Sequence, residues 1–169
     1  MSASDDRADA SKESLTGGRA AWVPPHWFEV LFWRVHRRVV RMSRGRKGLW
    51  DPRPGKWGAL RLTVPGRRSG EPRSVILGYF ADGDDLVTMA MNGWNGPEPA
   101  WWLNLQAHPK AIVDLAGGIR REVIGREATG EERDRLWQRW REIDKGLDEL
   151  AARRPRQTAV VVLTTALAA

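Results

Sequence analysis

The chain has 169 residues, of which 41% are hydrophobic and 29% charged, so it is large enough for one domain with its own core. It has no cysteine, and its three histidines (His26, His36 and His108) lack the spacing of metal ligands, which argues against disulfides, thiolate chemistry and a metal centre. No apolar stretch approaches the ~20 residues of a membrane span, and the polar N-terminus does not resemble a signal peptide, so we expect a cytoplasmic protein.

The net charge of +7 arises from one part of the sequence. Residues 26–73 carry thirteen basic and three acidic side chains, net +10, whereas the residues before and after this block carry net −1 and −2. Such a block attracts phosphates, carboxylates, nucleic acid or an anionic membrane surface. The alternative is a solvated basic face without a specific partner.

The N-terminal part predicts a polar tail followed by a helix. Residues 1–25 are small, polar and charged, which is typical of a disordered tail. Over residues 27–43 apolar side chains recur at helical spacing and arginines occupy another face, so we expect a basic amphipathic helix. The apolar stripe holds Phe28, Leu31, Phe32, Val35, Val39 and Met42, and the basic face holds Arg34, Arg37, Arg38 and Arg41. This helix would pack on the domain or lie on a membrane surface.

Short strands separated by turns are expected in the rest of the chain. An irregular basic connector over 44–58 leads to a short helix and several strands. A longer helix is expected to begin at a capping box of Thr129 and Glu132, to continue through Leu150 and to end before Pro155. The strands are expected at 59–64, 74–80, 86–91, 111–115, 120–127 and 158–165, with turns at 82–84 and 117–118 and the short helix at 100–106. This order favours an antiparallel barrel or a small α+β sheet.

The segment GRRSGEPR, residues 66–73, has the composition of an anion site. It places Arg67, Arg68 and Arg73, the hydroxyl of Ser69 and two glycines between two expected strands. Guanidinium groups bind phosphate or carboxylate through two parallel hydrogen bonds, and glycines let backbone N–H groups approach a ligand. On composition alone, a polar hairpin loop with solvated arginines explains the segment equally well.

A second candidate group follows the third expected strand. Residues 90–96 form a loop that leads into the short helix, where backbone N–H groups would face a polar ring or an anion. The helix carries Trp101, Trp102 and Asn104, although tryptophans at such positions commonly anchor a core. The sequence contains no P-loop, no Rossmann glycine motif and no G-x-S-x-G nucleophile motif.

Together these segments resemble the deazaflavin (coenzyme F420)-dependent nitroreductase and F420H2-dependent quinone reductase family. The resemblance rests on LRLTVPGRRSGEPR (60–73), Tyr79, the turn at 82–84, residues 90–93 and PAWWLNLQAHP (99–109), and it extends from about residue 27 to 165. It implies an α+β, mainly β fold, namely a split β-barrel of the FMN-binding-like type with flanking helices. We therefore expect a single domain over residues 26–169 behind the tail.

The resemblance also implies roles for individual residues. Tyr79, the only tyrosine of the chain, is the candidate to orient a substrate or to donate a proton. Trp137 and Trp140 stand where some family members have tyrosines over the substrate, so nitroimidazole reduction is not assumed. The phosphate and oligoglutamate tail of F420 is assigned to Arg67, Arg68, Ser69 and Arg73, the ring loop to Ala90, Met91, Asn92 and Gly93, and the supporting helix to Trp101 and Asn104.

The sequence thus predicts an oxidoreductase that transfers a hydride from reduced F420 to an electron-poor acceptor, such as a quinone, an activated alkene or a nitro compound. The alternatives are an FMN-binding reductase of the same fold and a non-enzymatic basic module on a membrane surface. No motif supports nucleic-acid binding. We expect a small-molecule acceptor, no metal, and a monomer or homodimer. We also expect that the protein can contact the membrane surface peripherally through residues 27–43.

Overall fold

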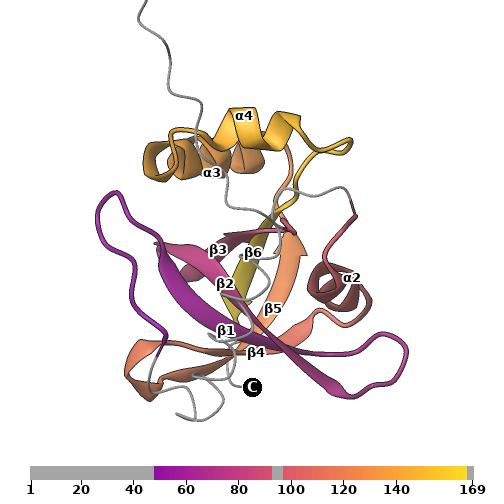
Figure 1. The fold of residues 1–169 in the computed structure, drawn as a ribbon. Helices are drawn as coiled ribbons and strands as arrows, with labels where there is room; N and C mark the ends of the chain where they lie inside the picture. The colour runs from indigo at the N-terminus through magenta and orange to yellow at the C-terminus, as the bar shows by residue number, and fades with distance from the viewer. Residues whose placement is uncertain (1–47, 93–96, 167–169) are drawn as a thin grey trace, which may run out of the picture.

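The computed structural model describes residues 48–92 and 97–166, and its centre is a closed antiparallel barrel of six strands (Figure 1). The strands follow the order β1-β2-β3-β6-β5-β4 around the barrel, and β1 pairs with both β2 and β4. Closure gives every strand a partner on both sides. Their bounds are β1 Gly58–Pro65, β2 Pro72–Asp82, β3 Asp85–Met89, β4 Lys110–Asp114, β5 Arg120–Glu127 and β6 Val160–Thr165.

Alternating apolar side chains fill the interior of the barrel. Leu60, Leu62 and Val64 of β1 are fully buried, as are Val113 of β4 and Leu163 of β6. Each aliphatic side chain of this size contributes about 1.5–3 kcal/mol when it is removed from water. The strands therefore bury their inward face, and the predicted mainly β barrel is confirmed.

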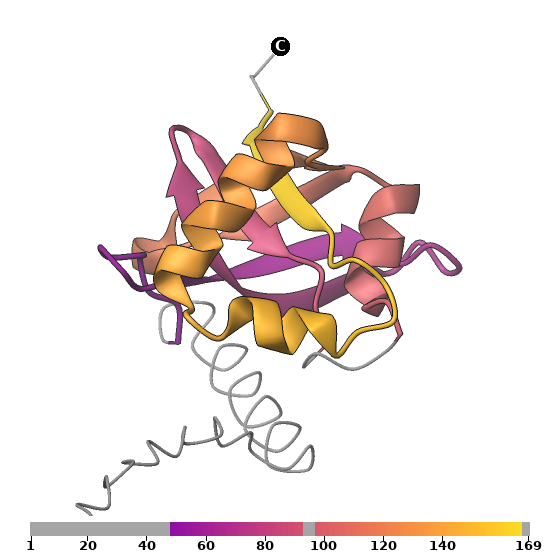
Figure 2. The ribbon, with the colours of Figure 1, turned by 90° about the horizontal axis from the view of Figure 1, so that it is seen from above.

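Three α-helices pack on the outside of the described barrel, and a short 3-10 helix (Ala116–Gly118) joins β4 to β5 (Figures 1 and 2). Helix α2 (Ala100–Ala107) lies beside β1 and β5, whereas α3 (Gly130–Ile143) and α4 (Leu147–Ala152) cover the side of β3 and β6. A second apolar core lies under α3 and α4, where Trp140 packs edge-on against Phe80 with ring centroids 5.1 Å apart. None of the helices in residues 48–92 and 97–166 is long and apolar enough to cross a membrane.

The prediction of one long helix from residue 129 to 150 is wrong, because the chain forms two helices there. Helix α3 ends at Ile143, and Asp144 Oδ1 accepts a hydrogen bond from the N–H of Gly146 at 3.0 Å. This local turn competes with continued helix. The expected capping box is also wrong. The Thr129 side chain makes no capping bond, and the Glu132 carboxylate pairs instead with the Arg126 guanidinium at 2.6 Å.

The expected strands match the observed ones within about two residues. The turn after β2 is confirmed, since Asp82 pairs with Asp85 and Gly83 has a φ of +62°. The third strand ends two residues early because the Met91 N–H donates to the carbonyl of Met89 and turns the chain. The predicted tail and the predicted basic helix lie outside the described residues.

Candidate functional site

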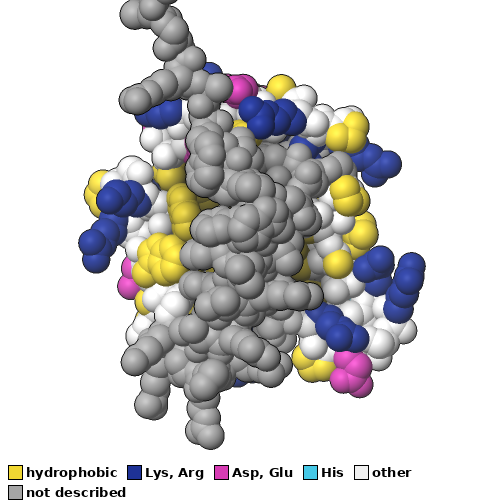
Figure 3. Space-filling view, in the orientation of Figure 1, with side chains coloured by type: hydrophobic (Ala, Val, Ile, Leu, Met, Phe, Trp, Pro, Cys, Tyr) yellow, Lys and Arg dark blue, Asp and Glu magenta, His cyan; other side chains and the backbone are white. Residues whose placement is uncertain are grey.

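A groove of about 470 Å³ lies between the β1–β2 loop, the start of β2 and the start of α2. Figure 3 shows basic side chains gathered at the lower right, over the β1–β2 loop. The groove brings together Arg67, Arg68, Ser69, Arg73, Asn92, Trp101 and Asn104. The described lining contains three guanidinium groups and no carboxylate. We call it the arginine groove.

The β1–β2 loop that forms one wall closes on Gly66. The Gly66 N–H donates to the Glu71 carbonyl at 2.8 Å, and the Gly66 carbonyl accepts from the N–H groups of Ser69 and Gly70 at 3.2 and 2.7 Å. A Cβ atom at position 66 would lie 3.0 Å from Ser69 Oγ, and Gly70 has a φ of +70°. Both glycines are therefore required by the shape of the loop, which turns the arginine side chains toward the groove.

Asn104 joins the two walls of the arginine groove. Its side chain is buried on α2, and Oδ1 accepts from the backbone N–H of Arg67 at 3.2 Å and from Arg67 Nη1 at 3.1 Å. A buried amide oxygen that receives two donors fixes their positions. Helix α2 therefore holds the loop and the Arg67 guanidinium in place beside the groove.

The candidate ring loop leaves β3 through a tight turn. Ala90 is buried, its N–H donates to the Ala159 carbonyl at 2.9 Å, and its own carbonyl accepts from Arg154 Nη1 at 2.7 Å. The chain then reaches Asn92 in the groove, while Met91 packs against the second core. Ala90 and Met91 are outside the groove lining, and the predicted residue Gly93 lies outside the described residues.

The structure does not bring Tyr79 to the arginine groove. Tyr79 pairs with Gly58 at the start of β1, whereas the β1–β2 loop follows the end of that strand. Its hydroxyl donates to Asp51 Oδ1 at 3.4 Å. Burial of the phenol, with the nearby Asp51 carboxylate, raises the pKa of Tyr79 to about 12. The phenol therefore stays protonated at neutral pH and is directed toward Asp51.

The late tryptophans also lie away from the arginine groove. Trp140 is buried in the second core, and Trp137 Nε1 donates to Asp148 Oδ1 at 2.9 Å. The structure instead reveals a partly buried contact that sequence reasoning missed, between the buried Arg154 side chain and the half-buried Glu98 carboxylate. The two residues are 56 positions apart and belong to no motif, so no sequence signal indicates the pair.

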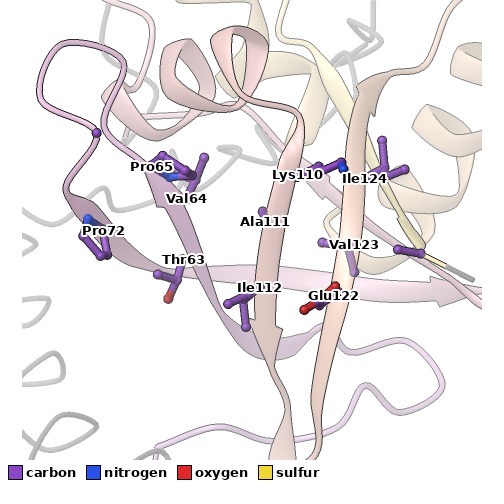
Figure 4. A pocket seen from close by; sticks show the side chains of 12 residues that line it. Thr63, Val64, Pro65, Pro72, Lys110, Ala111, Ile112, Glu122, Val123 and Ile124 are labelled. Atoms are coloured by element: carbon purple, nitrogen blue, oxygen red, sulfur yellow. The ribbon is translucent and has the colours of Figure 1, made fainter. Parts of the chain in front are cut away.

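A second and larger groove of about 830 Å³ lies along β1, β4 and β5 (Figure 4). Its lining is mainly apolar and includes Pro65, Ile112 and Ile124. The ionisable side chains in the described lining are Lys110 and Glu122, which have opposite charges. This groove therefore lacks the concentration of positive charge that a polyanion requires, and the arginine groove is the better candidate.

Comparison with known proteins finds relatives that span the described barrel. A family profile described as F420H(2)-dependent quinone reductase matches residues 32–165. An F420H(2)-dependent quinone reductase of Mycobacterium tuberculosis is 31% identical over 146 residues, which are 85% of this chain and 95% of the relative. The solved F420-H2 dependent reductase FDR-A is 26% identical, with a TM-score of 0.58 over 68% of this chain and 96% of that chain.

Proteins outside this family share the same fold. The heme storage protein HutZ of Vibrio cholerae has a TM-score of 0.50 at 10% identity and covers 78% of this chain and 90% of its own. At this identity the likeness concerns the barrel and not the ligand.

Proposed function

Because the chain belongs to the F420H(2)-dependent quinone reductase family, we propose that its arginine groove holds the phosphate and oligoglutamate tail of coenzyme F420. The chain is an F420-dependent oxidoreductase. The observation that carries the proposed site is the set of three arginines in a groove whose described lining has no carboxylate.

The residues of the groove fit a string of anions. Arg67, Arg68 and Arg73 each offer paired N–H donors, and the Asn104 oxygen holds the Arg67 guanidinium at 3.1 Å. Gly66 and Gly70 leave room at the loop where side chains would intrude or strain the backbone. A single phosphate, as in FMN, would need fewer cations than this groove provides.

This chain supplies binding and orientation for the reaction. When bound, reduced F420 provides a hydride, which together with one proton converts a quinone into a quinol. We propose that the three arginines would hold the anionic tail and that Asn92 and Trp101, which also line the groove, would contact the ring. Holding donor and acceptor in one geometry provides much of the rate gain in such reactions. Water is the proposed proton source, because the Tyr79 hydroxyl is directed to Asp51.

The double variant Arg67→Ala/Arg68→Ala tests the proposed site. Both side chains are exposed in the groove, so the fold should remain stable. Loss of two charge-assisted contacts should raise the Kd for F420 by about 10- to 100-fold. Isothermal titration calorimetry with F420, and with FMN as the comparison ligand, measures this change.

The matched control is Arg53→Ala/Lys56→Ala. It also removes two positive charges, but from exposed positions outside the groove lining. We expect its Kd for F420 to stay within about threefold of that of the original protein, since long-range charge effects are screened. Equal weakening in both double variants would show that net charge matters and the groove does not.

We further propose a lipid-soluble quinone as the acceptor and peripheral association with an anionic membrane. Support comes from the basic residues 26–73 and from Trp50 and Trp57, whose side chains are 40% and 41% exposed. Arg53 and Lys56 lie between them and are also exposed. Tryptophan beside basic side chains is typical of segments at a membrane interface.

A further inference from the structure

Among the described residues, Arg154 has the most completely buried cationic side chain. Its side chain is 0% exposed, and it lies in the segment between α4 and β6. Nη1 donates to the Ala90 carbonyl at 2.7 Å and to Thr158 Oγ1 at 2.9 Å. Nη2 donates to Glu98 Oε1 at 3.3 Å. One guanidinium therefore joins its own segment to two other parts of the chain, at Ala90 and at Glu98.

This contact is a costly way to stabilise a fold. Removing a guanidinium and a carboxylate from water costs several kcal/mol, and the cost is recovered only when all their hydrogen bonds are made. Arg154 Nε and Glu98 Oε2 are buried and have no partner among the described residues. In other proteins, replacing such a pair with apolar side chains of similar volume is often neutral or stabilising. The pair therefore calls for a role other than stability.

The partners of Arg154 mark the two ends of the loop between β3 and α2. Ala90 is the first residue after β3, and its N–H is also held by the Ala159 carbonyl. Glu98 immediately precedes Pro99, Ala100 and Trp101, which line the arginine groove. We propose that Arg154 is a positioning residue that holds Ala90 and Glu98 in place, so that the neighbouring groove residues Asn92 and Trp101 can receive the ring end of F420. The proposal rests on the proposed function of the groove.

The geometry explains why an arginine is required. The fork of the guanidinium reaches the Ala90 carbonyl with one nitrogen and the Glu98 carboxylate with another. A lysine has a single nitrogen and cannot present this planar fork. The contact therefore links the end of β3 to the start of α2, which also carries Asn104.

A pair of variants separates positioning from stability. Arg154→Met leaves the partly buried Glu98 carboxylate without its cation, so both thermal stability and F420 affinity should fall. The double variant Arg154→Met/Glu98→Met removes both charges, so its Tm should return toward that of the original protein. Its Kd for F420 should nevertheless remain raised about tenfold, because the link to the Ala90 carbonyl is lost.

Three measurements distinguish a positioning role from a purely structural one. Calorimetry gives the Kd for F420, thermal unfolding without cofactor gives the Tm, and steady-state kinetics give separate KM values for F420H2 and for menadione, a quinone without a long lipid tail. We expect the KM for F420H2 to rise with the Kd, and the KM for menadione to change less than threefold. Recovery of F420 affinity together with the Tm in the double variant would overturn the proposal.

Arg133→Met is the matched control. The Arg133 side chain is 16% exposed and donates to the Thr158 carbonyl at 3.4 Å, so it holds the same segment without contacting Ala90 or Glu98. It should lower the Tm and leave the Kd for F420 unchanged. An equal loss of affinity in this variant would also overturn the proposal.

Two further outcomes are distinguishable. If the methionine variants do not fold, Arg154→Lys is tested instead, because it keeps the positive charge and lacks the planar pair of guanidinium nitrogens. A folded Arg154→Lys variant with unchanged affinity for F420 would contradict the positioning role. Failure of the original protein to bind F420 would instead reject the proposed function of the groove.

Discussion

At the scale of single residues, Tyr79 shows how burial changes the chemistry of a side chain. The phenol is 2% exposed inside the barrel, and its hydroxyl donates to Asp51. Burial of the phenol, assisted by the Asp51 carboxylate, raises its pKa from 10.0 to about 12. A phenol in this state is a poor acid at neutral pH, and it lies away from the arginine groove.

The raised pKa predicts a loss of stability at high pH. The folded protein keeps the proton that the unfolded chain loses near pH 10, so the stabilisation is complete below pH 10 and declines as the pH rises toward 12. Two pKa units correspond to about 2–3 kcal/mol. Because Tyr79 is the only tyrosine, the ultraviolet absorbance of tyrosinate reports on this group alone. We expect a midpoint near 12 in the folded protein and near 10 in denaturant.

Tyr79→Phe provides the control for this prediction. It should lack the tyrosinate signal, show a smaller fall in Tm between pH 10 and 12, and keep its activity with F420H2 at neutral pH. A large loss of kcat in a stable Tyr79→Phe variant would restore Tyr79 as the proton donor.

At the scale of elements, the close approach of α2 to β5 positions one wall of the groove. A Cβ atom added at Gly125 of β5 would lie 2.8 Å from Cγ of Leu105, which is fully buried on α2. The same helix carries Trp101 and Asn104 in the groove lining. The absence of a side chain at Gly125 therefore sets how far α2 stands from the barrel.

Gly125→Ala should displace α2 and weaken both stability and cofactor binding. Overpacking of this kind typically costs about 1–3 kcal/mol of unfolding free energy. The Kd for F420 should rise because Asn104 moves relative to Arg67. Chemical denaturation and calorimetry measure the two effects. Gly78→Ala is the control, since its Cβ would meet Trp57 Cε3 at an ordinary 3.4 Å.

The elements could be predicted where their signals are local. Alternation in Leu60, Leu62 and Val64, followed by turn residues, is sufficient to predict β1. The break between α3 and α4 could not be predicted, because Leu147 continues the apolar stripe of α3. The pairing of β1 with β4 could not be predicted either. It joins Leu62 to Val113 across 51 positions, and only closure of the barrel determines it.

At the scale of the whole molecule, the two walls of the arginine groove differ in how far the sequence predicts them. The run from Gly66 to Arg73 supplies one wall of the groove by itself, so composition and family resemblance were enough to propose it as part of a site. The other wall depends on contacts between distant segments, such as those of Arg154 with Ala90 and Glu98. The prediction for Tyr79 placed it on the correct strand, but composition does not reveal which end of the barrel a strand residue reaches.

The concentration of positive charge in residues 26–73 predicts salt-sensitive binding to anionic membranes. Arg37→Gln/Arg38→Gln should weaken binding to phosphatidylglycerol vesicles by about 30-fold, at about 1 kcal/mol for each arginine near the surface. Arg153→Gln/Arg156→Gln removes the same charge from exposed positions outside that block and should have little effect. Cosedimentation with anionic and neutral vesicles measures both.

Salt provides the second test of membrane binding. Raising the ionic strength from ~0.1 M to ~1 M shortens the Debye length from about 10 Å to about 3 Å, so an electrostatic attachment should be released. Binding that persists at high salt would point to insertion of apolar side chains such as Trp57 as the main attachment. Absence of binding to anionic vesicles at low salt would reject membrane association. The proposed F420 site would be unaffected, because the arginine groove lies within the barrel domain and its proposed binding of the cofactor requires no membrane.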